Sequence, residues 1–261
     1  IGSQLMHMLT VIIVGLAMGA TVSIGNAVGA KNAREAGRNI GAAVSIFTVF
    51  SVLVTALLIL TRNPILRILS TPPEAFEEAG RYVLICFIGV PFITAYNVIS
   101  SIFRGLGDTK SPMIFVFAAG VINVILDYIL IGPLAMGAMG AAIATVTGQW
   151  AAALLALIFN VKFNRDIHLS VKNIAPRMDI IKPVLTVGVP AIIMNSISSV
   201  MNFSMNQILM GFEAVGETAT GVFSIYYKLQ SFFFMPLFGL NNATISIVAF
   251  NYGARKPERI I

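Results

Sequence analysis

Residues 111–132 read SPMIFVFAAGVINVILDYILIG and carry a single charged side chain, Asp127. At about 1.5 Å of rise per residue, a helix of this length crosses a hydrocarbon core about 30 Å thick. A membrane β-strand would instead alternate polar and apolar residues over about ten positions. The stretch therefore predicts a transmembrane helix.

Six more stretches of the chain are similarly apolar. The 261 residues are 57% hydrophobic and only 11% charged, against about 25% charged residues in an ordinary soluble domain. The runs are longer than the apolar segments of a soluble α/β enzyme, which reach about 14 residues. They cover residues 2–28, 39–61, 82–103, 137–161, 183–212 and 218–252. We predict an all-α integral membrane protein, a polytopic helical bundle with seven spans.

The basic residues predict how the spans are oriented. Of the 17 Lys and Arg residues, thirteen fall in the loops of one side and three in the loops of the other. The side rich in Lys and Arg is expected to be cytoplasmic, which makes the chain a multi-pass protein of the inner or plasma membrane. The thirteen are Lys31, Arg34, Arg38, Arg104, Lys110, Lys162, Arg165, Lys172, Arg177, Lys182, Arg255, Lys256 and Arg259. The net charge of +6 thus reflects topology, and no nucleic-acid partner is expected.

The seventh stretch repeats features of the first. Residues 20–24 (ATVSI) match residues 243–247 (ATISI) at an offset of 223. Residues 29–31 (GAK) match residues 253–255 (GAR) at an offset of 224, as does Gly15 with Gly239. If the seventh span corresponds to the first, the repeated unit holds six spans. An even number gives both copies the same orientation, so the halves are parallel repeats.

This repeat predicts the size of the intact protein. Twelve spans are expected, one before Ile1 and four after Ile261, so the chain is interpreted as a fragment. Residues 1–161 would form an amino-terminal lobe without its first helix, and residues 162–182 a cytoplasmic linker. Residues 183–261 would be the first two helices of a carboxy-terminal lobe.

Polar residues inside the spans are the candidates for chemistry, because a charge at a helix centre costs about 2.5–3.5 kcal/mol to insert. Asn123 and Asp127 are four residues apart and share a helix face. Together they can hold a proton or Na⁺ with further oxygen ligands, and Thr145 and Thr147 of the next span offer hydroxyls. Alternatively, Asp127 is only a solvated or helix-pairing residue. No other metal site is predicted.

Lys228 lies deep in the seventh span, where it can line a water-filled cavity and meet an anionic partner, or only anchor the interface. Cys86 is the single cysteine, so no disulfide is available. The sequence has no phosphate-binding GxxxxGK[ST] loop, no HExxH and no nucleophile elbow. We expect a protein that is not an enzyme and uses no cofactor.

Several motifs resemble the multidrug and toxic compound extrusion (MATE) family of efflux transporters. They are residues 103–113 (FRGLGDTKSPM), 123–127 (NVILD), 137–145 (GAMGAAIAT), 234–237 (FMPL) with Gly239, and 251–254 (NYGA). The resemblance implies two six-helix lobes around a central cleft, with this chain running from about the second helix to the eighth. It places Asn123, Asp127 and Thr145 in a cation site of the amino-terminal lobe. Some relatives carry a glutamate on the seventh helix, where this sequence offers Asn195, Asn202 and Asn206 instead, so no carboxy-terminal site of that type is expected.

The resemblance implies a secondary active transporter, coupled to H⁺ or Na⁺, that exports amphipathic or cationic drugs by alternating access. Lys228 and Asn195 are the candidates for the substrate cavity. The expected partners are a small amphipathic molecule and the lipid bilayer, and the full-length protein is expected to be a monomer. Two alternatives stay open: a lipid-linked oligosaccharide flippase of the same superfamily, and a membrane scaffold that transports nothing.

Overall fold

The computed structural model describes residues 2–68, 76–163, 178–212 and 216–260, and these residues contain helices and no strands. Seven of the helices are long and apolar enough to cross a membrane, with mean hydropathies from 1.5 to 2.6. The chain is therefore a multi-pass helical membrane protein, as predicted. The elements are α1 (Gly2–Gly29), α2 (Ala33–Leu60), α3 (Arg62–Ile68), α4 (Phe76–Gly105), α5 (Lys110–Ile131), α6 (Gly137–Phe163), α7 (Met178–Met210), α8 (Gly216–Gly253) and the 3₁₀ turn Pro257–Arg259.

Three helices begin five or six residues earlier than the apolar runs indicated. α2 starts six residues before the predicted run and carries Glu35 in its first turn, while α4 starts with Glu77 and Glu78. Acidic residues stabilise a helix N-terminus, but a search for apolar runs does not count them. α7 likewise begins at Met178, inside the predicted linker, of which residues 164–177 lie outside the described residues. The short helix α3 was not predicted, because seven residues show no periodicity.

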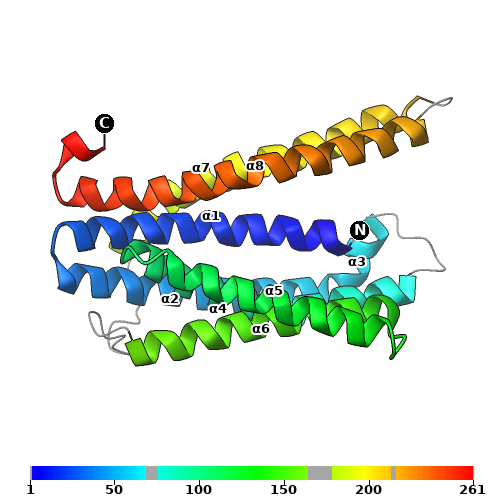
Figure 1. Ribbon diagram of the computed structural model, residues 1–261, viewed down its shortest axis with the longest axis horizontal. Coiled ribbons are helices and arrows are strands. Elements are labelled where there is room, and N and C mark those ends of the chain that lie inside the picture. Colours follow the sequence, from blue (N-terminus) through cyan, green and yellow to red (C-terminus); the bar gives the residue numbers. More distant parts are fainter. Residues whose placement is uncertain (1, 69–75, 164–177, 213–215, 261) are drawn as a thin grey trace.

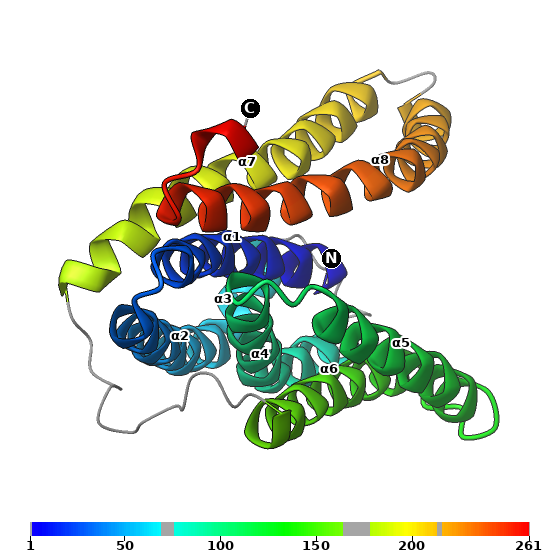
Figure 2. The same cartoon turned by 60° about the vertical axis from the view of Figure 1, so that its left-hand side comes forward.

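α1 lies at the centre of the arrangement. It packs on α2 and α4 on one side and on α7 and α8 on the other, and Figure 1 shows α7 and α8 running together alongside it. α5 and α6 pack on each other, and α6 also packs closely on α4. In Figure 2 this α4–α5–α6 group lies on the far side of α1 from α7 and α8. α5 and α6 make no contact with α7 or α8 in the described part of the chain.

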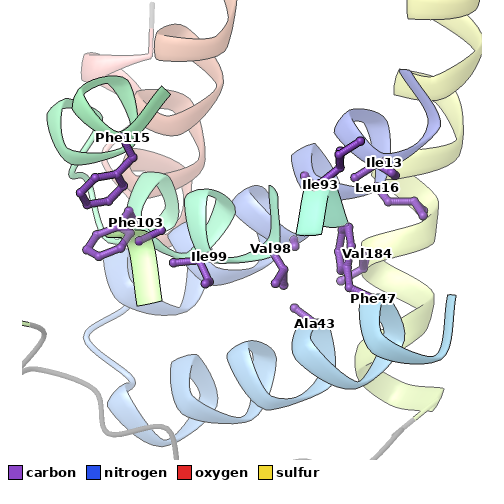
Figure 3. Packing of buried hydrophobic residues seen from close by; sticks show 13 residues of the cluster. Ile13, Leu16, Ala43, Phe47, Ile93, Val98, Ile99, Phe103, Phe115 and Val184 are labelled. Carbon is purple, nitrogen blue, oxygen red and sulfur yellow. The ribbon is translucent and has the colours of Figure 1, made fainter. Parts of the chain in front are cut away.

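The core joins the first six long helices (Figure 3). Ile13 and Leu16 of α1 belong to one buried cluster with Phe47 of α2 and Val184 of α7. At one end of it Phe103, Phe115 and Phe159 form a triad with ring centroids 5.4–6.0 Å apart. The division at residues 162–182 stays a prediction, but this core crosses it.

The repeat inferred from the sequence is also visible in the backbone. After α1, Lys31 has φ 56°, its N–H donates to the Val28 carbonyl, and the Asn32 N–H donates to the Ala27 carbonyl. After α8, Arg255 has φ 54° and the same two bonds recur 224 residues later. Both ends are Schellman motifs. The two helices therefore end in the same way.

The two equivalent ends also touch each other reciprocally. A Cβ on Gly29 would clash with the carbonyl oxygen of Phe250, and a Cβ on Gly253 would clash with that of Asn26. The two contacts are equivalent, because Gly253 and Phe250 are the residues that follow Gly29 and Asn26 by 224 positions. α1 and α8 are thus related by a local two-fold arrangement, in which small residues permit close approach of the backbones.

Candidate cation-binding site

The turn between α4 and α5 fixes where the site helix begins. Gly107 adopts φ 91°, and the N–H groups of Gly107 and Asp108 donate to the carbonyls of Arg104 and Phe103, which closes α4 with a Schellman motif. The Asp108 carboxylate then accepts hydrogen bonds from the Lys110 and Ser111 N–H groups, both at 3.0 Å. Asp108 therefore caps α5. This explains the first motif, residues 103–113, as a helix–turn–helix junction.

Small residues of α6 bring it close to the polar face of α5. A Cβ on Gly148 would lie 3.0 Å from the Ala119 carbonyl oxygen and 3.3 Å from the Asn123 Cβ. A Cβ on Gly140 would lie 3.1 Å from the Leu130 Cβ. Asn123 is thus held against α6, and its Nδ2 is buried without a hydrogen-bond partner in the described structure.

Asp127 follows on the same face of α5, one turn after Asn123. It is half-buried, its Oδ1 is buried, and no described residue donates a hydrogen bond to that atom. The Tyr82 hydroxyl of α4 interacts mainly with Cys86 and more weakly with the Asp127 carboxylate. One carboxylate oxygen is therefore enclosed by the packed helices, while the residue as a whole is only half-buried. Tyr82 was missed in the sequence, because nothing in one chain indicates which residue of another span faces Asp127.

The two threonines of α6 differ in position. Thr145, the predicted third member of the site, is exposed, whereas Thr147 is half-buried and directly precedes Gly148. Gly148 packs on the Cβ of Asn123, so Thr147 is the neighbour in sequence of the α6 residue that approaches Asn123. The role of Thr145 as a ligand stays a prediction.

The substrate-cavity candidates lie elsewhere. The Asn195 amide of α7 points at α1, where its Nδ2 is 3.9 Å from the Met18 Sδ. Lys228 of α8 is exposed and forms no ion pair among the described residues. Since α5 does not contact α7 or α8 in the described part of the chain, neither residue is brought together with Asp127.

The arrangement around Asp127 suits a proton or a small hard cation. A carboxylate oxygen that no described group donates to has lone pairs available for a proton or for an ion. Hard cations are bound by oxygens, which Asp127, Asn123 and Tyr82 all carry. The described residues hold no cluster of three His, Cys, Asp or Glu side chains, so the other ligands of such an ion would be neutral.

Seven spans, a parallel internal repeat and a half-buried polar pair define a polytopic membrane protein of a type common among secondary transporters. A family model, MatE, matches residues 1–129 and 190–260. The chain therefore belongs to the MatE family. Members of this family are transporters, not enzymes.

Individual relatives agree with this assignment. The chain is 30% identical to the "Probable multidrug resistance protein NorM" of Thermotoga maritima, over 100% of its own length and 56% of that protein. It is similar in structure to a "multidrug resistance MATE family transporter of the MOP superfamily" in an outward-facing conformation, with a TM-score of 0.89, 25% identity, and coverage of 97% of this chain and 56% of that one. A MOP superfamily transporter from Pyrococcus furiosus gives a TM-score of 0.87 at the same identity and coverage. The chain spans about half the length of the curated relatives it matches.

Proposed function

We propose that the protein exports amphipathic, drug-like compounds across the cell membrane, driven by a gradient of H⁺ or Na⁺. The observation that carries the proposal is the half-buried pair Asn123 and Asp127 on the face of α5 that packs on α6, where the Asp127 Oδ1 has no hydrogen-bond donor among the described residues. Membership of the MatE family and the multidrug resistance named for its relatives support the exported class.

In the proposed mechanism, a cation enters from outside and binds at Asp127 in one conformation of the protein. Neutralising the carboxylate removes the cost of its burial and so favours a state in which it is enclosed. Coupling to export requires only that the cation and the exported compound favour different states. Alternating access then follows from exchange between these states.

The test is efflux from vesicles that contain the complete protein in its membrane. Asp127→Asn keeps the shape and removes the titratable charge, so gradient-driven efflux of a cationic dye should be lost while the amount of inserted protein is unchanged. Glu258→Gln, which removes a carboxylate from the exposed 3₁₀ turn, is the matched control and should keep wild-type efflux. Wild-type efflux by Asp127→Asn would refute the proposed coupling site.

Imposing a pH gradient and a Na⁺ gradient separately identifies the coupling ion. Thr145→Ala and Thr147→Ala, measured in the same vesicles, identify which hydroxyl contributes. A flippase would instead move a labelled lipid-linked sugar with no dye efflux. A scaffold would respond to neither gradient and move neither compound.

A further inference from the structure

A cavity of about 440 Å³ opens where α1 ends and where α2 and α7 begin. Small-ligand sites in proteins typically enclose about 300–1,000 Å³, so this volume admits a ligand and not only water. None of its lining residues belongs to α4, α5 or α6, so the cavity is separate from the site at Asp127. It lies at the end of the bundle that the distribution of basic residues assigns to the cytoplasm.

Two arginines give this cavity its charge. Arg34 and Arg38 both line it, and their four-residue spacing places them on one face of α2. Neither forms an ion pair or a hydrogen bond with any described residue. Among the described lining residues the one carboxylate is that of Glu35, which accepts a hydrogen bond from the Asn32 Nδ2 at 2.8 Å in the cap of α2. Two guanidinium groups and one carboxylate give the described lining a net positive charge.

The position of Arg34 is unfavourable for the helix that carries it. Arg34 lies in the first turn of α2, where the helix dipole disfavours a cation by about 0.3–1 kcal/mol. Topology alone would be satisfied by a basic residue anywhere in the loop. Binding of an anionic ligand in the cavity would explain why Arg34 stands in the first turn of α2.

The walls of the cavity are amphipathic. On the α1 side, the Asn26 Oδ1 is buried without a partner among the described residues, while Asn39 of α2 donates to the Ser23 carbonyl at 2.9 Å and ties the two helices together. On the α7 side the lining is apolar, with Ile180, Pro183 and Val187. A ligand that fits has an anionic end, a hydrogen-bond donor such as a hydroxyl, and an apolar part.

We propose that this cavity binds a phosphate group, held between Arg34 and Arg38, with the apolar part of the ligand against α7. Guanidinium groups pair with phosphate through charge-assisted hydrogen bonds. Basic pockets between helices at the cytoplasmic face are a recurrent form of lipid headgroup recognition. The phosphate can come from an anionic phospholipid or from a soluble phosphate. Occupancy would link α2 and α1 to α7 and so hold this end of the bundle together.

Native mass spectrometry of the complete protein in detergent tests the proposal with defined probes. Phosphatidylglycerol, phosphatidylcholine and inorganic phosphate are titrated separately. Phosphatidylglycerol should bind saturably, and Arg34→Gln/Arg38→Gln should weaken that binding by at least about tenfold. Arg34→Lys/Arg38→Lys retains both positive charges and should keep most of the phosphatidylglycerol binding. The control Arg62→Gln/Arg67→Gln removes two cations from α3, which follows the opposite end of α2, and should leave binding unchanged.

The probes also distinguish the source of the phosphate. Displacement of phosphatidylglycerol by millimolar inorganic phosphate would assign the site to a soluble phosphate, and resistance to displacement would assign it to a lipid. Absence of saturable binding of both phosphatidylglycerol and inorganic phosphate by the wild-type protein would overturn the proposal, whether or not the variants fold. Equal weakening by the control pair would overturn it as well.

Discussion

The helices α1 and α8 end in the same way and lie in different surroundings. Each closes with a Schellman motif on a basic residue, Lys31 or Arg255, and each presents a glycine to the other helix. Yet half of the residues in the most apolar 18-residue stretch of α1 are buried, whereas only 11% of those in the corresponding stretch of α8 are. The turn is therefore encoded by the residues that form it, because it recurs wherever the repeat recurs. Burial depends on which partners surround a helix.

The largest effect is expected where both helices take part equally. Gly29→Ala or Gly253→Ala would place a methyl group against a backbone carbonyl oxygen of the other helix, which cannot rotate away as a side chain can. Overpacking of this kind costs about 1–3 kcal/mol. Each variant should therefore lower the thermal unfolding temperature in detergent, and by similar amounts.

The double variant tests whether these two contacts form one interface. Once one methyl group has separated α1 from α8, the second meets less resistance, so the combined loss should be smaller than the sum of the single losses. Strict additivity would indicate two independent sites. Unequal single losses would contradict the two-fold relation between the helix ends.

A smaller effect is expected at a second equivalent pair, Gly15 and Gly239, which differ in surroundings. A Cβ on Gly15 would lie 2.5 Å from the Ile192 Cγ1 and 2.8 Å from the Ile192 N. A Cβ on Gly239 would meet nothing within 4 Å. Gly15→Ala should therefore destabilise by about 1–2 kcal/mol, whereas Gly239→Ala should be neutral or stabilise by up to about 1 kcal/mol.

Thermal unfolding of the two single variants, compared with the wild type, measures this difference. An equally large loss from Gly239→Ala would show that α8 is covered at this position in the intact protein. The two glycines would then not differ in how closely they are packed.

The number of spans could be predicted because the bilayer imposes one requirement on every span, a long apolar run. The helix starts at residues 33, 76 and 178 could not, because their polar first turns obey capping rules and not hydropathy. The repeat could be recognised from residues 29–31 (GAK) and 253–255 (GAR), because each triplet ends its helix in the same turn, at Lys31 and at Arg255. The reciprocal contact of Gly29 and Gly253 was not foreseen, because a sequence does not state which helices touch.

The candidate site shows the same limit. Asn123 and Asp127 could be paired from the sequence, because residues four apart on a helix share a face whatever surrounds them. Tyr82 and the difference between Thr145 and Thr147 depend on how α4 and α6 are rotated against α5. That rotation follows from small residues such as Gly140 and Gly148, whose contacts appear only in three dimensions.

The smallest effect is expected where α1 and α8 agree most closely, at the residues with positive φ. A non-glycine residue in the left-handed region pays a steric cost that glycine avoids, although glycine loses more backbone entropy on folding. Lys31→Gly and Arg255→Gly should therefore each stabilise by roughly 0.5–1 kcal/mol, within error of each other. Thermal unfolding measures both, and Asn32→Gly, which removes the side-chain cap of α2, provides a control expected to destabilise slightly. A gain at one position and a loss at the other would show that the basic side chains, and not the backbone turn, determine the stability of these ends.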